Sequence, residues 1–245
     1  MTSETAKVSL RDRNIGEIAA ALPGATAVFR KFKLDFCCGG DLTLGEVASK
    51  RGLDIASIEG ALAALDPNAG LTVPEETGPL IDHILSRYHE THRRELPELI
   101  RLARKVEAVH AVHPQAPIGL ADTLHEMHSE LEVHMQKEEM ELFPLMRRDG
   151  DPLDALSIEQ MRDDHHRHGD HLRRLEEIAN GFVPPEGACR SWQALCAGGA
   201  KLVDDVMEHI HLENNVLFPR FGQPESAGHA YPAGSTTAVQ PDAQR

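Results

Sequence analysis

The stretch HMQKEEMELFP, residues 134–144, recurs 75 residues later as HIHLENNVLFP, residues 209–219. Both copies share a His, a Glu four residues later, and a Leu-Phe-Pro ending at the same spacing. Upstream of each copy lies a His-x2-His pair, His89 with His92 and His165 with His168, at an offset of 76 residues. These near-equal offsets indicate that this part of the chain consists of two related helical hairpins.

Apolar residues around these motifs repeat at alternating steps of three and four, the spacing of one helix face. They predict four long helices, over residues 85–103, 120–145, 158–179 and 192–216. Asp151 is placed to cap the third helix, with Pro152 in its first turn. Short connections between helices of this length predict an all-α fold, an up-down-up-down four-helix bundle.

Turn-forming and breaking residues divide the chain into four parts. Residues 1–66 carry short helical stretches at 15–22, 44–51 and 55–65 and predict a small helical domain that contains Cys37 and Cys38. Residues 67–79 are rich in Pro and Gly and predict a linker, and residues 80–221 hold the bundle. Residues 222–245 have the composition of a disordered tail.

Composition excludes several kinds of partner. Lys and Arg total 25 against 39 Asp and Glu, and a surface with a net charge of −14 repels nucleic acid and anionic lipid headgroups. No apolar run approaches the roughly 18 residues of a spanning helix, and residues 1–14 lack the apolar core of a signal peptide. We therefore expect a cytoplasmic protein that binds neither nucleic acid nor a membrane.

Histidine is concentrated in the bundle, where 14 of the 15 lie between His83 and His211. A His and a Glu four residues apart share one helix face, and here that face is otherwise apolar. The spacing therefore buries Glu138 and Glu213 on faces that carry no Lys or Arg, and an unpaired buried carboxylate costs several kcal/mol. A bound cation would remove that cost.

Antiparallel helices bring the polar residues of all four helices to one level of the bundle. The candidate ligands are His89, His134, Glu138, His165, His209 and Glu213. Six ligands exceed the four of a structural zinc site but suit two metals that share carboxylates. Imidazole and carboxylate without thiolate favour iron over manganese or zinc. The sequence therefore predicts a di-iron centre.

The roles of several other residues stay open at this level. His92 and His168 share the buried faces and are either ligands or residues that support ligands or line a channel. The remaining histidines of the bundle, among them His211, fall off these faces and are expected to face solvent. Adjacent cysteines are poor disulfide partners, so Cys37 and Cys38 are either a reactive dithiol, a contact for a soft metal, or two packed small residues. Cys189 and Cys196 are most simply explained by packing.

Further motifs carry a family resemblance: FRKF (29–32) leading into DFCCGG (35–40), RYH (87–89), RELPEL (94–99) and LENN (212–215). With the two Leu-Phe-Pro motifs, they closely resemble the iron-sulfur cluster repair di-iron proteins (the RIC family) over roughly residues 10–221. A CCGG-type amino-terminal domain joined to a hemerythrin-like bundle is characteristic of that family. His110 also matches a family position.

The resemblance implies a particular site and setting. Four His and two bridging Glu would hold two irons, joined by an oxo or hydroxo group, at the six positions named above. Family members are cytoplasmic, often homodimeric, and restore iron-sulfur clusters after nitric oxide or peroxide damage. The implied partners are therefore damaged iron-sulfur proteins, with nitric oxide or oxygen species at the irons. Oxygen-carrying hemerythrins have a further His where this chain has Gly169, and one fewer imidazole leaves coordination positions open.

Three functional hypotheses follow. The leading one is an iron-donating repair factor in which Cys37 and Cys38 help to dock or relay iron. The second is a redox enzyme that reduces nitric oxide or peroxide at the two irons. The third is a sensor or carrier of a diatomic gas, with the amino-terminal domain reporting the ligand state.

Overall fold

The computed structural model describes residues 9–67, 69, 73–148 and 155–221, and these contain helices, turns and no strand. An isolated antiparallel bridge joins Asn14 to Thr43. The predicted all-α fold class is confirmed. The predicted cap at Asp151 with Pro152 and the predicted disordered tail at 222–245 lie outside the described residues.

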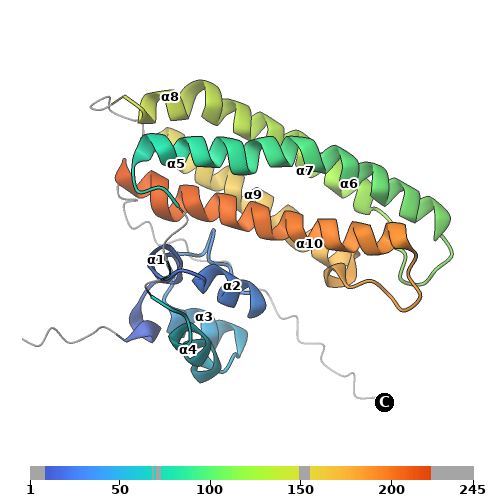
Figure 1. Ribbon diagram of the computed structural model, residues 1–245, viewed down its shortest axis with the longest axis horizontal. Helices are drawn as coiled ribbons and strands as arrows, with labels where there is room; N and C mark the ends of the chain where they lie inside the picture. The colour runs from blue at the N-terminus through green and yellow to red at the C-terminus, as the bar shows by residue number, and fades with distance from the viewer. Residues whose placement is uncertain (1–8, 68, 70–72, 149–154, 222–245) are drawn as a thin grey trace, which may run out of the picture.

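Four helical rods lie side by side in the bundle (Figure 1). The first rod consists of α5 (Thr77–Ile84), η2 (Leu85–His89) and α6 (Glu90–Val109), and the second of α7 (Leu120–Lys137), η3 (Glu138–Leu142) and α8 (Phe143–Met146). The third is α9 (Ala155–Ile178), followed by the short turn η4 (Asn180–Phe182). The fourth consists of α10 (Arg190–His211), η5 (Leu212–Leu217) and η6 (Phe218–Arg220). The first and second rods form one hairpin, and the third and fourth form the other.

The four apolar faces found in the sequence are turned toward the bundle core. Almost all of their residues are buried, and Leu85, Leu145 and Val216, at the ends of the faces, are half-buried. The first rod begins at Thr77, three residues before the predicted start of the bundle at residue 80, and so includes Pro79. A proline is tolerated there because the first N–H groups of a helix have no intrahelical acceptor.

The amino-terminal domain consists of η1 (Leu10–Asp12), α1 (Ile15–Ala21), α2 (Ala25–Lys31), α3 (Leu44–Arg51) and α4 (Ile55–Ala63). Thr43 caps α3 in a reciprocal box with Glu46, and Asp54 caps α4. Helix α2 was not predicted, because Pro23-Gly24 suggested a longer break and the β-branched Thr26 and Val28 weaken the helical pattern. Pro23-Gly24 is only the turn between α1 and α2, with Gly24 at φ 84°.

The domain packs against the fourth rod (Figure 1). Phe29 and Phe36 belong to the same apolar core as Ile210 of α10. The expectation that His211 faces solvent was wrong: it is buried, with its ring 5.5 Å from that of Phe36. A helix face that looks exposed in isolation is here covered by a second domain. No described helix is both long and apolar enough to cross a membrane.

Candidate metal centre

Two groups of buried side chains converge at one level of the bundle. His89 and His209 form one group with Glu138 and Glu213, and His134 and His165 form the other with the same two carboxylates. Within each group the ligand atoms lie within 4.8 Å of one another. The structure therefore brings together all six residues selected from the sequence, with each carboxylate shared between two pairs of imidazoles.

The atoms of these groups face one another in a way that suits cations. His89 Nε2 lies 3.1 Å from His209 Nε2, and His134 Nε2 lies 3.0 Å from His165 Nε2. Both oxygens of Glu138 and Oε2 of Glu213 are buried and face Nε2 atoms of His89, His134 and His165 at 3.0–3.4 Å. Four imidazole nitrogens turned toward one another in pairs around buried carboxylates would be costly in a dry core. The donor set fits two metal ions, and imidazole with carboxylate is a set that iron accepts.

Without a bound cation, the neighbouring imidazoles stabilise the charged form of the buried carboxylates. Burial raises the pKa of Glu213, but the charges and hydrogen bonds of His209 and His165 overcome burial and hold this pKa well below its usual range. Burial likewise lowers the pKa of His134, whereas Glu138 and Asp164 raise it, in net to about 10. For His209, burial outweighs the attraction of Glu213 and lowers the pKa.

Three of the rods change from α to π winding where they carry a ligand. His89 ends the π-turn η2, Glu138 begins η3, and Glu213 lies in η5. A π-turn accommodates an extra residue and often marks a functional site. The third rod, which carries His165, is α-helical over all its described residues, 155–178.

Outer hydrogen bonds orient three of the four imidazoles. His89 Nδ1 lies 2.7 Å from Glu139, which also accepts from Arg93. His134 Nδ1 lies 3.3 Å from Asp164, and His165 Nδ1 lies 2.9 Å from Asn214 Oδ1. Such partners select the ring tautomer and strengthen the nitrogen that faces a metal.

His92 and His168 lie outside both converging groups. Both are buried. The centre of the His92 ring lies 5.4 Å from that of His209, and the centre of the His168 ring lies 5.0 Å from that of His134. His92 Nε2 and His168 Nδ1 have no hydrogen-bond partner among the described residues. The two residues are therefore buried neighbours of the ligands and belong to neither group.

The two adjacent thiols lie where the amino-terminal domain meets the third rod. Cys37 Sγ is 3.8 Å from Cys38 Sγ, and Cys38 Sγ contacts the backbone oxygen of His165 at 3.5 Å. Their mutual hydrogen bond raises the pKa of Cys37 and, with the help of His166, lowers that of Cys38 to about 6. A Cβ at Gly169 would lie 3.7 Å from Cys38 Sγ, an ordinary van der Waals distance, so Gly169 lies directly beside this thiol.

One side-chain cluster was not apparent from the sequence. At the end of the bundle far from the ligands, His110 Nε2 lies 3.2 Å from Cys189 Sγ, and the His110 ring packs on Trp192 at 4.8 Å. The pair joins the first rod to the fourth. The two residues are 79 apart in sequence, and no periodicity links them.

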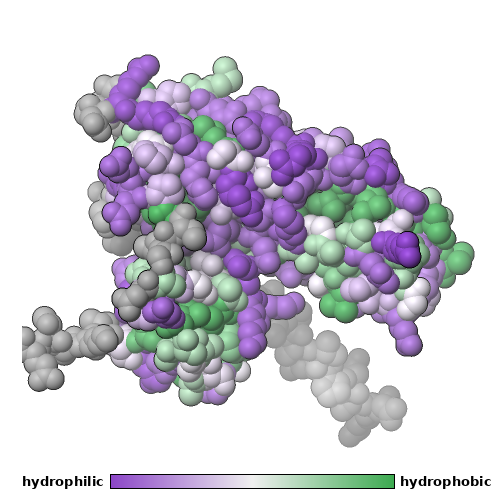
Figure 2. Space-filling model, viewed as in Figure 1, coloured by the Kyte–Doolittle hydropathy of each residue, from purple (hydrophilic) through white to green (hydrophobic). Residues whose placement is uncertain are grey.

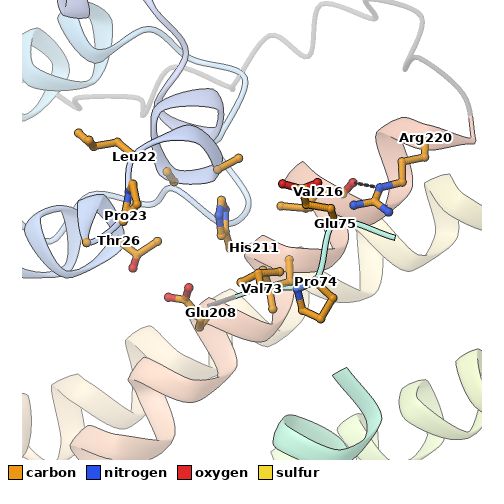
Figure 3. Close-up of a pocket in the computed structure, with 14 residues that line it drawn as sticks. Leu22, Pro23, Thr26, Val73, Pro74, Glu75, Glu208, His211, Val216 and Arg220 are labelled. Atoms are coloured by element: carbon orange, nitrogen blue, oxygen red, sulfur yellow. Dashed lines mark hydrogen bonds between the residues drawn. The ribbon is translucent and has the colours of Figure 1, made fainter. Parts of the chain in front are cut away.

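A cavity of about 360 Å³ lies between the amino-terminal domain and the fourth rod, with Thr26, His211 and Glu208 on its walls (Figure 3). None of the six candidate ligands lines it. A second, more open cavity of about 630 Å³ is lined by Tyr88, the residue next to the ligand His89.

A helical bundle with two buried groups of imidazoles and shared carboxylates belongs to the class of cation-binding four-helix bundles. In agreement, residues 80–221 match the family model described as Hemerythrin HHE cation binding domain. Residues 11–66 match a second family model, described as Domain of Unknown function (DUF542).

Curated relatives cover most of the chain. The iron-sulfur cluster repair protein YtfE of Dickeya chrysanthemi is 46% identical over 213 residues, 86% of this chain and 96% of the relative. Proteins of the same name from Citrobacter koseri and Escherichia coli are each 44% identical over 216 residues, 87% of this chain and 98% of each relative. The chain therefore belongs to the hemerythrin HHE family and, within it, to the group named iron-sulfur cluster repair protein YtfE.

Proposed function

We propose that this protein is a di-iron factor that repairs damaged iron-sulfur clusters by donating iron. The observation that carries the proposal is the pair of buried groups that share Glu138 and Glu213. The donors of this site are nitrogen and oxygen, whereas the clusters that would receive the iron are held by cysteine thiolates. The relatives named for cluster repair, which cover 86% and 87% of the chain, support the same role.

We infer that His89 and His209 hold one ion and that His134 and His165 hold the other. Glu138 and Glu213, which belong to both groups, would be shared by the two ions and would neutralise part of their charge. Bound iron supplies a store of transferable metal and one-electron chemistry. The surrounding apolar core excludes water, and the outer partners Glu139, Asp164 and Asn214 fix the imidazole rings.

Repair of a damaged enzyme tests the donor role. A cluster enzyme inactivated by nitric oxide would be incubated with the iron-loaded protein or with the same amount of free ferrous iron. We expect the loaded protein to restore more activity, and the variant Glu138→Ala with Glu213→Ala to restore none beyond the free iron. Equal recovery with free iron would rule out donation.

Cys37 and Cys38 are proposed as a redox pair beside the centre. Oxidation of the two thiols by peroxide would form a strained disulfide and release two protons and two electrons to the oxidant. We expect a mass loss of two hydrogens confined to the peptide that contains both cysteines, while buried Cys196 stays unchanged. Persistence of both thiols in excess peroxide would contradict this role.

The protein is further proposed to act as a cytoplasmic homodimer that meets nitric oxide or oxygen species at the centre. Exposed apolar side chains at the end of the bundle far from the ligands offer an interface (Figure 2). They are Val109, Val112, Ile118 and Val183, with exposures from 59% to 99%. Sedimentation of the wild type should give a dimer, and Val112→Lys should shift it toward monomer.

A further inference from the structure

The repeat allows the surroundings of the two ligand groups to be compared residue by residue. Asp164, which precedes His165, corresponds to Tyr88, which precedes His89, at the same offset of 76. The contacts of these two residues can be compared, because each residue lies against an imidazole of a neighbouring rod. Asp164 meets His134, and Tyr88 meets His209.

The two contacts differ in kind. Asp164 Oδ2 lies 3.3 Å from His134 Nδ1 and accepts its hydrogen bond. Tyr88 instead lies flat on the His209 ring, with ring centres 5.4 Å apart and an angle of 4° between the planes. His209 Nδ1 is buried and finds no hydrogen-bond partner in the described part of the chain.

The number of outer hydrogen bonds therefore differs between the two metal positions. Both imidazoles at the His134/His165 position are held at Nδ1, one by Asp164 and the other by Asn214. At the His89/His209 position only His89 has such a partner among the described residues. Loss of one outer partner typically weakens metal binding by about 10- to 100-fold.

Tyr88 also separates His209 from the more open of the two cavities. This cavity of about 630 Å³ is lined by Tyr88, by Asp204, Asp205 and Glu208 of α10, and by Arg30, Arg87 and Lys201, which pair with those carboxylates. Tyr88 is 5% exposed, so one aromatic ring divides the buried ligand from a cavity walled by ion pairs.

We propose that the two metal positions are unequal and that the ion held by His89 and His209 leaves first, past Tyr88. The proposal rests on the di-iron function and names which of the two ions is transferable. The ion held by His134 and His165 is retained. Transfer through Cys38, which touches His165, would require the opposite order.

Release of iron to a chelator tests the order. Anaerobic protein loaded with two ferrous ions would be mixed with an excess of a coloured ferrous chelator, and release followed by absorbance. We expect two phases of equal amplitude with rates that differ by about tenfold or more. Crystals of half-depleted protein, measured at the iron absorption edge, should show the remaining ion beside His134 and His165.

Matched variants connect the two phases to the residues. Tyr88→Asp places at this position the residue that the repeat has at 164, and it should slow the fast phase relative to Tyr88→Leu, which offers no hydrogen-bond acceptor. Asp164→Ala should accelerate the slow phase about tenfold or more. Tyr88→Phe keeps the ring and should leave both phases close to those of the wild type.

The possible results separate the order of release from the donor function. A single phase, or a remaining ion beside His89 and His209, would overturn the proposal and leave the donor function intact. Two ordered phases in a protein that fails to repair a damaged enzyme would overturn the donor function and leave the asymmetry intact. Equal rates for Tyr88→Asp and Tyr88→Leu would show that the missing outer hydrogen bond does not set the order.

Discussion

The two hairpins of the bundle place the same ligands at the same spacing, yet what surrounds those ligands differs. In the first hairpin the position two residues after the bridging Glu is Met140, which is 77% exposed. In the second hairpin the equivalent residue, Asn215, donates a hydrogen bond to the backbone oxygen of Phe36 in the amino-terminal domain. The comparison shows that the two hairpins keep the same ligands at the same spacing, while the residues next to the ligands differ according to whether solvent or the amino-terminal domain lies against them.

The largest effect is expected from removing what both hairpins share. Glu138→Ala with Glu213→Ala should abolish binding of both ions, whereas the wild type should hold about two irons per chain. Iron analysis with visible spectroscopy measures this, and circular dichroism checks that the helices persist. Glu141→Ala, which removes an exposed carboxylate from the same π-turn as Glu138, is the control and should keep both ions. Metal retained by the double variant would refute the assigned ligands.

Removing an outer partner should affect one metal position alone. Glu139→Ala deprives His89 of its hydrogen bond and should weaken one of the two binding events by about 10- to 100-fold. Anaerobic titration with ferrous iron separates the two events. Glu132 shares Arg93 with Glu139, so Glu132→Ala is a matched control with both events unchanged. Equal weakening of both positions by Glu139→Ala would mean that the two metal positions do not act separately.

The contact between the second hairpin and the amino-terminal domain depends on close backbone approach. A Cβ at Gly40 would lie 2.5 Å from Asn215 Oδ1 and 3.0 Å from the backbone oxygen of Phe36. We expect Gly40→Ala to lower the free energy of unfolding by about 1–3 kcal/mol, measured by urea denaturation. Gly60→Ala, in an exposed helical position with nothing within 4 Å, should instead raise it by about 0.5–1 kcal/mol. The same sign for both variants would contradict this role of close packing at Gly40.

A smaller effect on stability is expected at Asp205 of the second hairpin, which pairs with Arg87 of the first. Hydrogen bonds from Arg87 and Lys201 overcome burial and lower the pKa of Asp205. A carboxylate with a lowered folded-state pKa stabilises the fold above its ordinary pKa of about 4 and loses that contribution as the pH falls. Asp205→Asn should therefore lower the free energy of unfolding by about 1 kcal/mol at pH 7 and by less at pH 3.

Glu130, the repeat equivalent of Asp205, provides the comparison for this prediction. It is half-exposed and meets His171 at 3.1 Å, so Glu130→Gln should change the free energy of unfolding by only a few tenths of a kcal/mol. Urea denaturation at pH 7 and pH 3 measures both variants. An Asp205→Asn effect that grows toward pH 3 would mean that the Asp205 carboxylate does not stabilise the fold through its lowered pKa.

The sequence was sufficient for the bundle and for the six candidate ligands. Helical periodicity and the repeat place His134 and Glu138 on one buried face, and a buried acid without a cation-bearing neighbour indicates a metal. Both signals are local in the chain.

What the sequence did not reveal depends on contacts between distant segments. His211 is buried because the amino-terminal domain lies on it, and Cys189 meets His110 because two rods end at the same level. The different parts played by Tyr88 and Asp164 also need three dimensions, because each residue acts on an imidazole of another rod.

Asn214 accepts a hydrogen bond from His165 and donates one to the backbone oxygen of Cys37, so a single amide joins a ligand to the amino-terminal domain. Two binding events that share such a link influence each other equally in both directions. Binding of iron should therefore strengthen the contact between the bundle and the amino-terminal domain. Separation of the domain from the bundle would, by the same reciprocity, weaken the binding of the ion beside His165.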